Sequence, residues 1–72
     1  MNVIGPQIKR LREQNHMTQE ELTARCNLVG WNISRGTLAK IESQVRRVTD
    51  SEVALMAEAL KVEISELYED PE

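Results

Sequence analysis

The sequence predicts an all-α fold, a compact domain of five short helices. Three observations lead to this prediction. Apolar residues recur at helical spacing in five segments. Two of these segments begin with a threonine that is followed three residues later by a glutamate, which is the pattern of a helix capping box. The length of 72 residues allows one modest hydrophobic core, so we expect a single domain over residues 1–72.

The first helix is predicted over residues 6–14. Gly5 followed by Pro6 is typical of a cap and a helix start, because proline at the first helical position lacks only an N–H group that would have no partner there. Ile8 and Leu11 then form an apolar stripe. This stripe is expected to face the core.

The next two helices each begin at a hydroxyl side chain that can cap a helix. Thr18 is predicted to open a helix from Gln19 to about Cys26, and Ser34 a helix that ends near Ser43. The residues of these two helices that are expected to point inward are Leu22, Cys26, Leu38 and Ile41.

The last two helices lie in the C-terminal third of the chain. Thr49 with Glu52 predicts a helix from Asp50 to about Leu60. Its apolar face, expected to be buried, holds Val53, Met56, Ala57 and Leu60. A last turn over 64–68 is expected to cover the core with Ile64 and Leu67, and residues 70–72 are expected to form a frayed tail. The methionines and Cys26 are expected in the core.

Charge is divided unevenly along the chain, whose net charge is −3. Residues 9–47 hold eight basic and four acidic side chains, a balance of +4. Residues 48–72 hold one basic and eight acidic side chains, a balance of −7. A basic part of this kind attracts phosphates, whereas an acidic part faces away or meets another protein. The alternative is that these charges only solvate the helices.

Several chemistries find no support in the residues present. Cys26 is the only cysteine and His16 the only histidine, so neither an internal disulfide nor a metal site is expected. No paired catalytic groups and no glycine-rich phosphate loop are present, so we expect neither an enzyme nor a bound cofactor. The absence of a long apolar run and of a signal-peptide pattern predicts a cytoplasmic protein without a membrane partner.

An ordered set of residues resembles the phage-repressor and Cro-like (XRE-type) helix-turn-helix family over about 4–68. The set comprises Ile8, Arg12, the run Thr18-Gln19-Glu20-Glu21-Leu22, the pair Ile41-Glu42, the run Met56-Ala57-Glu58-Ala59-Leu60 and the run Ser65-Glu66-Leu67. The resemblance implies a lambda-repressor-like domain that binds double-stranded DNA. It further implies a transcriptional regulator of bacterial or phage type, associated with the nucleoid, that represses by occupying an operator.

The resemblance assigns the helix that begins at Ser34 to the DNA major groove. The base-contacting residues it implies are Arg35, Gly36, Thr37 and Lys40. Arginine can bind guanine O6 and N7 with two hydrogen bonds, threonine can meet a base or a thymine methyl, and lysine can reach a base or a phosphate. Glycine lets the backbone approach the groove closely. The alternative is that these exposed side chains are only solvated.

Four further residues are implied to contact DNA phosphates: Gln19, Ser34, Arg46 and Arg47. Gln19 and Ser34 stand at helix N-termini, where the helix dipole favours an anion. Arg46 and Arg47 lie in the loop after the reading helix. Arg12 and Glu42 resemble a structural ion pair that joins the first helix to the end of the third.

The connection after the second helix is longer than is usual in this family, with the surplus in residues 27–33. One interpretation is a tolerated surface insertion whose Leu28 and Ile33 plug the core. The other is that Trp31 and Asn32 touch the DNA backbone or a partner. We favour the first. The family pattern also has glycine where this chain has Gln44 and Lys61, and alanine where it has Thr23.

One reading helix offers few base contacts, so a two-fold homodimer on an inverted-repeat operator is expected. The candidate surface for self-association is the last helix, where Leu67 and Tyr68 lie beside Val62 and Ile64, although these residues can equally close the core. The alternative function is an antitoxin-like or adaptor module on the same fold, whose acidic C-terminal half binds a basic protein.

Overall fold

The computed structural model describes residues 4–68, and this range holds five α-helices and no strand. They are α1 (Ile4–Gln14), α2 (Gln19–Leu28), α3 (Arg35–Glu42), α4 (Asp50–Leu60) and α5 (Ile64–Leu67). The all-α prediction is confirmed. The frayed tail expected over 70–72 and Met1, which was expected in the core, lie outside the described residues.

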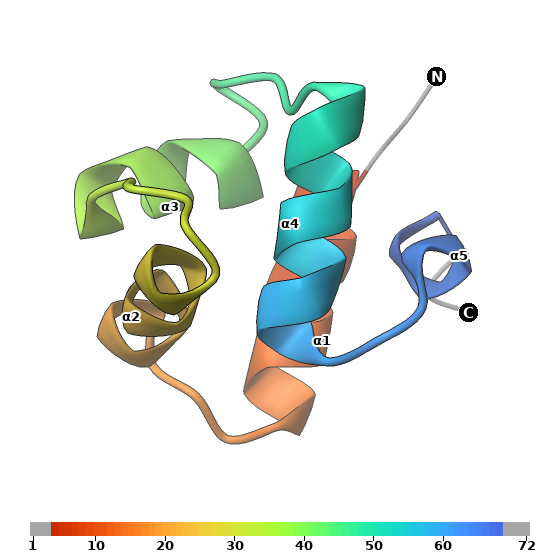
Figure 1. Cartoon of the computed structure of the whole chain (residues 1–72), viewed down its shortest axis with the longest axis horizontal. Helices are drawn as coiled ribbons and strands as arrows, with labels where there is room; N and C mark the ends of the chain where they lie inside the picture. Colours follow the sequence, from red (N-terminus) through yellow and green to blue (C-terminus); the bar gives the residue numbers. More distant parts are fainter. Residues whose placement is uncertain (1–3, 69–72) are drawn as a thin grey trace.

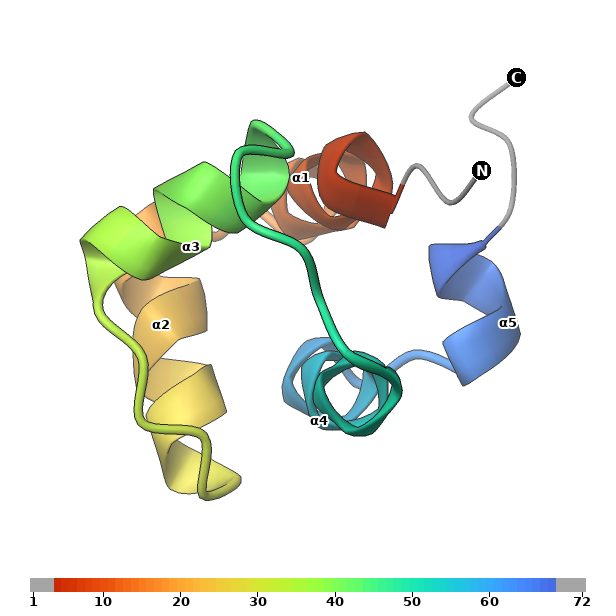
Figure 2. The ribbon, with the colours of Figure 1, turned by 90° about the horizontal axis from the view of Figure 1, so that it is seen from above.

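The helices surround one core. The main contacts between helices run from α1 to α3, from α3 to α2, from α2 to α4, from α4 to α5 and from α5 back to α1. Figure 1 shows α2 and α3 on one side of the molecule and α5 on the other, and Figure 2 shows the ring from above. The result places α3 at the outside of the molecule, next to the start of α2.

Local hydrogen bonds account for three helix starts. The Thr18 hydroxyl accepts the Glu21 N–H at 3.1 Å, and the Glu21 carboxylate accepts the Thr18 N–H at 2.8 Å. Thr49 and Glu52 form the same reciprocal pair at 3.3 and 3.0 Å. Ser34 caps α3 by accepting the Thr37 N–H at 3.1 Å. The predicted caps of α2, α3 and α4 are therefore present.

The start of α1 differs from the prediction. The helix already includes Ile4, so Gly5 is a helical residue rather than a cap. Pro6 is tolerated because the first N–H groups of a helix have no intrahelical partner. A side chain on Gly5 would collide with the carbonyl oxygen of Ile41, so this glycine allows α1 to pack closely on α3.

The core contains most of the residues that were expected there, with two corrections. Leu22, Leu38, Met56 and Leu67 are fully buried, and Met17 packs against the core from its edge. Cys26 is also fully buried, and this burial raises the pKa of its thiol to about 11. Ile64, by contrast, is 46% exposed and Leu28 is 85% exposed, so neither closes the core.

The segment after α2 folds back on the core through Trp31. This side chain is only 8% exposed, and Ile33 packs partly against the core. The side-chain amide of Asn27 donates to the carbonyl oxygens of Trp31 and Ile33 at 3.0 and 3.2 Å. The backbone N–H of Trp31 donates to the carbonyl oxygen of Cys26 at 2.8 Å. The insertion therefore does plug the core, but with Trp31 in the place expected for Leu28.

Between residues 4 and 68, three residues other than glycine have the left-handed backbone conformation. Gln44 and Lys61 follow helix ends with φ of 67° and 60°, at the two positions where the family pattern has glycine. His16, between α1 and α2, has φ of 57°, a conformation that was not predicted for it from the sequence. Each such residue costs up to about 1 kcal/mol relative to glycine. Thr23 is accommodated in α2 because its hydroxyl donates to the Gln19 carbonyl oxygen at 2.7 Å.

Candidate nucleic-acid interface

The outer surface of α3 presents the residues that were predicted to contact bases. Arg35, Gly36 and Lys40 are exposed and Thr37 is half-buried, whereas Leu38, Ile41 and Glu42 are buried on the opposite side of the helix. A Cβ atom on Gly36 would meet nothing closer than the Ser34 hydroxyl, 3.8 Å away. Packing within the protein therefore does not require this glycine.

Thr37 and Ser34 share a hydrogen bond. Their hydroxyl oxygens lie 3.1 Å apart, and the Ser34 oxygen also accepts the Thr37 N–H. Both hydroxyls lie at the first turn of α3. A hydroxyl in this arrangement has remaining capacity to bond an outside group, because each hydroxyl has one donor and two acceptor positions.

A buried ion pair anchors the C-terminal end of α3. Arg12 and Glu42 are 8% and 6% exposed, and the guanidinium donates to the two carboxylate oxygens at 2.8 and 3.2 Å. Arg12 also donates to the Met17 carbonyl oxygen at 2.8 Å. The pair therefore joins α1, the turn after it and the end of α3. Replacing only one partner would leave the other charge buried without compensation.

Gln19 continues this network to the start of α3. Its amide nitrogen donates to Glu42 at 3.0 Å, and its amide oxygen accepts from Arg35 at 3.2 Å. Since an amide nitrogen carries two hydrogens, one donor of Gln19 remains for another group. One chain of hydrogen bonds thus runs from Arg12 through Glu42 and Gln19 to Arg35.

Arg35 has a second partner that sequence reasoning missed. Its guanidinium lies 3.7 Å from the carboxylate of Glu20, with the two side chains 55% and 73% exposed. Such an exposed pair contributes little to stability and is weakened by salt. The first turn of α2 therefore holds the long side chain of Arg35 loosely.

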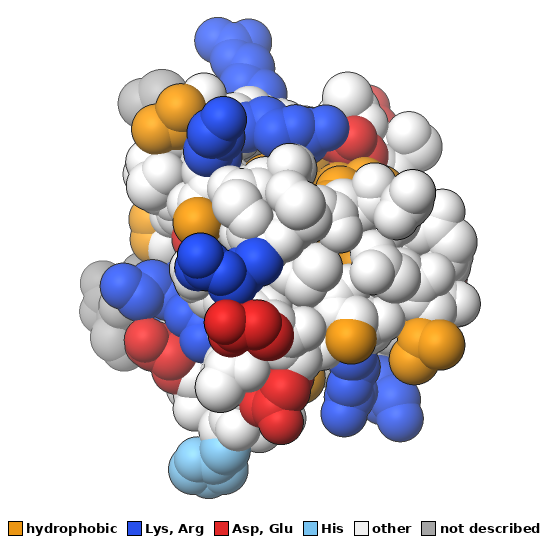
Figure 3. All heavy atoms as spheres, turned by 90° about the vertical axis from the view of Figure 1, so that its left-hand side faces the viewer, with side chains coloured by type: hydrophobic (Ala, Val, Ile, Leu, Met, Phe, Trp, Pro, Cys, Tyr) orange, Lys and Arg blue, Asp and Glu red, His pale blue; other side chains and the backbone are white. Residues whose placement is uncertain are grey.

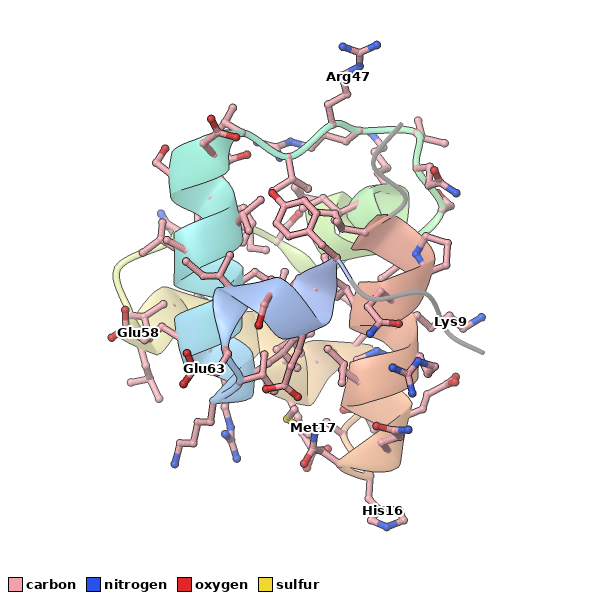
Figure 4. The ribbon with its side chains drawn as sticks, turned by 90° about the vertical axis from the view of Figure 1, so that its right-hand side faces the viewer. Lys9, His16, Met17, Arg47, Glu58 and Glu63 are labelled. Atoms are coloured by element: carbon pink, nitrogen blue, oxygen red, sulfur yellow. The ribbon has the colours of Figure 1, made fainter. Side chains whose placement is uncertain are left out.

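Arg46 and Arg47, which were both predicted to contact phosphates, have different surroundings in the structure. Arg46 forms two parallel hydrogen bonds with Glu52, at 3.1 and 3.0 Å. The hydrogen bonds from Arg46 hold the pKa of the Glu52 carboxyl below its usual range, and the same bonds raise the pKa of Arg46. Arg47 is exposed and points outward from the top of the molecule in Figure 4.

Basic and acidic side chains are interspersed on the face that carries α3. Figure 3 shows basic side chains along its upper edge, left of its centre and at its lower right, and acidic side chains below its centre and at its upper right. Under the loop from 43 to 49 lies a cleft of about 480 Å³ that sequence reasoning did not predict. Its lining includes Ile41, Val53 and Tyr68 as well as Arg46 and Arg47.

The chain matches the family model described as Helix-turn-helix over residues 8–67, which is most of its length. The chain is a member of the Cro- and repressor-like helix-turn-helix family. In this helix-turn-helix protein α2 and α3 form the motif, and the family is one of DNA-binding transcription regulators. No curated protein and no solved structure gives a significant match.

Two further observations concern the described part of the helix-turn-helix protein. No helix between residues 4 and 68 is both long and apolar enough to cross a membrane. Within the same range, no three histidine, cysteine or acidic side chains lie close enough together to hold a metal ion.

Proposed function

We propose that this helix-turn-helix protein is a sequence-specific regulator that represses transcription by occupying an operator, with α3 in the major groove. The observation that supports this proposal is the exposed outer surface of α3, whose position is held by the Arg12–Glu42 pair and by Gln19. A reading helix must be both exposed and rigidly placed, because base recognition depends on the distance and angle of each hydrogen bond.

The base contacts in this proposal come from the first two turns of α3. Arg35 binds a guanine with two hydrogen bonds after leaving Glu20, and Thr37 meets a base or a thymine methyl group. Lys40, one turn further, reaches a base or a phosphate. Gly36 between them allows the backbone to lie close to the groove.

The phosphate contacts come from helix starts and from the loop after α3. The free amide hydrogen of Gln19 and the hydroxyl of Ser34 lie at the N-termini of α2 and α3, where partial positive charge favours an anion. Arg47 adds a full charge from the loop. Arg46 was assigned the same role, but its pairing with Glu52 makes Arg47 the stronger candidate.

Dimerisation through α5 completes the proposal. Gln7 donates to the Glu66 carbonyl oxygen at 2.7 Å, and Leu67 is fully buried, so α5 is attached to the core. Ile64 and Tyr68 remain about half exposed, one helical turn apart. In the proposed dimer a second copy binds this surface, and each reading helix contacts one of two half-sites that lie about one DNA turn apart.

Selection of bound duplexes from a random pool tests the proposed function. We expect enrichment of an inverted repeat, with an affinity that falls steeply as the salt concentration rises. An absence of duplex binding even at low salt would instead favour the adaptor function, in which the acidic C-terminal half binds a basic protein. Enrichment of a single half-site would contradict the dimeric mode of binding but not the reading role of α3.

A further inference from the structure

Glu52 is the only acidic side chain among residues 4–68 that both caps a helix and holds an arginine of the loop after α3. Its carboxylate accepts the Thr49 N–H at 3.0 Å and the two nitrogens of Arg46 at 3.1 and 3.0 Å. The Glu52 side chain is 18% exposed and that of Arg46 37%. A two-point bond of this kind is geometrically specific as well as partly shielded from solvent.

The same bonds determine the path of the loop around Arg47. Arg46 also donates to the carbonyl oxygen of Arg47 at 3.1 Å. On the other side, the N–H groups of Val45 and Arg46 both donate to the Lys40 carbonyl oxygen in α3, at 2.8 and 3.1 Å. The backbone that carries Arg47 is therefore attached to α3 at one end and, through Glu52, to α4 at the other.

We infer that Glu52 is a positioning residue of the DNA interface. By keeping Arg46 in the ion pair, Glu52 orders the loop so that Arg47 reaches a DNA phosphate, and Arg46 stays paired with Glu52 when DNA is bound. This inference rests on the proposed DNA-binding function. It runs against the simple expectation from charge, since removing a negative charge near DNA ordinarily strengthens binding.

The test is Glu52→Gln, which removes the charge but keeps an oxygen that can accept the Thr49 N–H. We expect binding to a duplex to weaken about fivefold, as for the loss of an ion pair of about 1 kcal/mol. The slope of log affinity against log salt should also fall by about one, because the Arg47 contact is lost. Arg47→Ala should lower the slope by the same amount.

The matched control is Glu58→Gln, the same change of charge at the other end of α4. Glu58 is exposed and lies far from the loop that carries Arg47 (Figure 4). This variant should bind duplexes as tightly as the wild type or slightly more tightly. All variants are compared well below the temperature at which each unfolds.

A double-mutant cycle separates positioning from direct contact. If the inference holds, Arg46→Ala weakens binding about as much as Glu52→Gln, and the double variant is no weaker than either. Tighter binding by Glu52→Gln, combined with weaker binding and a lower slope for Arg46→Ala, would show that Arg46 leaves Glu52 and contacts the phosphate itself. Weaker binding with an unchanged slope would reduce Glu52 to a purely structural role. Both results would overturn the inference while leaving the proposed function intact, whereas absence of wild-type binding would overturn both.

Discussion

The side chains around α3 fall into two groups. One group holds α3 in place from inside the protein, and the other is exposed on its outer surface. Arg12 and Glu42 satisfy each other's charge in the interior, whereas Arg35 and Lys40 remain exposed. Gln19 lies between these two groups and is bonded to both Glu42 and Arg35. The energetic consequences of losing a side chain therefore differ sharply between the two groups.

Arg35→Ala should leave the fold intact and weaken binding to the selected site. Arg35 is exposed and its ion pair with Glu20 is loose, so the melting temperature should hardly change. The loss of a two-point contact with guanine should cost about 1 to 3 kcal/mol on the preferred site, and less on a site altered at one G·C pair. Lys9→Ala, an equal change of charge on exposed Lys9 of α1, is the control. Equal affinity of wild type and Arg35→Ala would remove Arg35 from the proposed interface.

Glu42→Ala should destabilise the protein strongly. It leaves the Arg12 guanidinium buried without its carboxylate, which should cost about 3 kcal/mol of unfolding free energy. For a domain of this size that loss lowers Tm by roughly 15 °C, measurable by circular dichroism. The double variant Arg12→Met/Glu42→Leu should recover much of the loss, because apolar side chains need no partner. A double variant as unstable as Glu42→Ala would show that packing, rather than the stranded charge, causes the effect.

At the scale of the elements, short-range capping determines where the helices begin. The loops after α2 and α3 are fixed instead by contacts with other parts of the protein. The segment after α2 is held to the core by Trp31 and by the Asn27 amide. The loop after α3 is held by Arg46 and Glu52. Each of these two loops gives a measurable signal.

Trp31 reports on the loop between α2 and α3. Because this tryptophan is the only one in the chain and is 8% exposed, its emission should be blue-shifted in the free protein. Adding operator DNA should change the emission little, since the indole packs into the core. Quenching or a large shift on DNA binding, in a titration with a duplex free of fluorophores, would mean that the loop opens or contacts DNA.

The Arg46–Glu52 pair should make stability depend on pH in the acid range. The lowered pKa of Glu52 means that its stabilising contribution is fully present above the pKa of an unfolded glutamate, about 4.3. It is lost as the pH falls through the lower pKa of the folded state. The difference in Tm between wild type and Glu52→Gln should therefore be largest near neutral pH and shrink below pH of about 4. A difference that stays constant down to strong acid would show that the pair does not stabilise the fold.

At the scale of the whole molecule, the proposed function uses two opposite sides. The side with α3 and the loop after it carries the proposed DNA contacts, whereas α5 lies on the other side of the core (Figure 1). An assembly through α5 would leave both reading helices uncovered. The half-exposed Ile64 and Tyr68 are therefore the residues on which an assembly can be tested.

Ile64→Ser should weaken self-association without unfolding the protein, because Ile64 is 46% exposed and its removal opens no internal cavity. Sedimentation should show the variant dissociating at higher concentration than the wild type, and binding to an inverted repeat should lose cooperativity. Leu28→Ser, on a residue 85% exposed in α2, is the control. If Leu28→Ser raises the concentration at which the assembly dissociates and Ile64→Ser does not, the dimer forms elsewhere.

Much of the fold follows from short-range patterns in the sequence. The bounds of α4, the two capping boxes and the burial of Leu22, Leu38 and Leu67 all depend on residues within one or two turns of each other. The order in which the family's characteristic residues occur along the chain was likewise sufficient to indicate the helix-turn-helix family. These features are local because a cap and an apolar stripe are completed by neighbours three or four residues away.

The tertiary structure decided which side chains meet across the chain. Leu28 and Trp31 are both large and apolar, and only the path of the turn after α2 puts Trp31 inside and Leu28 in solvent. Glu20 is indistinguishable in sequence from any exposed glutamate until α3 is packed across the start of α2 and brings Arg35 to it. Arg46 likewise finds Glu52 only because the loop after α3 turns back toward α4. Such pairings depend on the relative placement of helices, which arises from burial of the whole core and not from any local pattern.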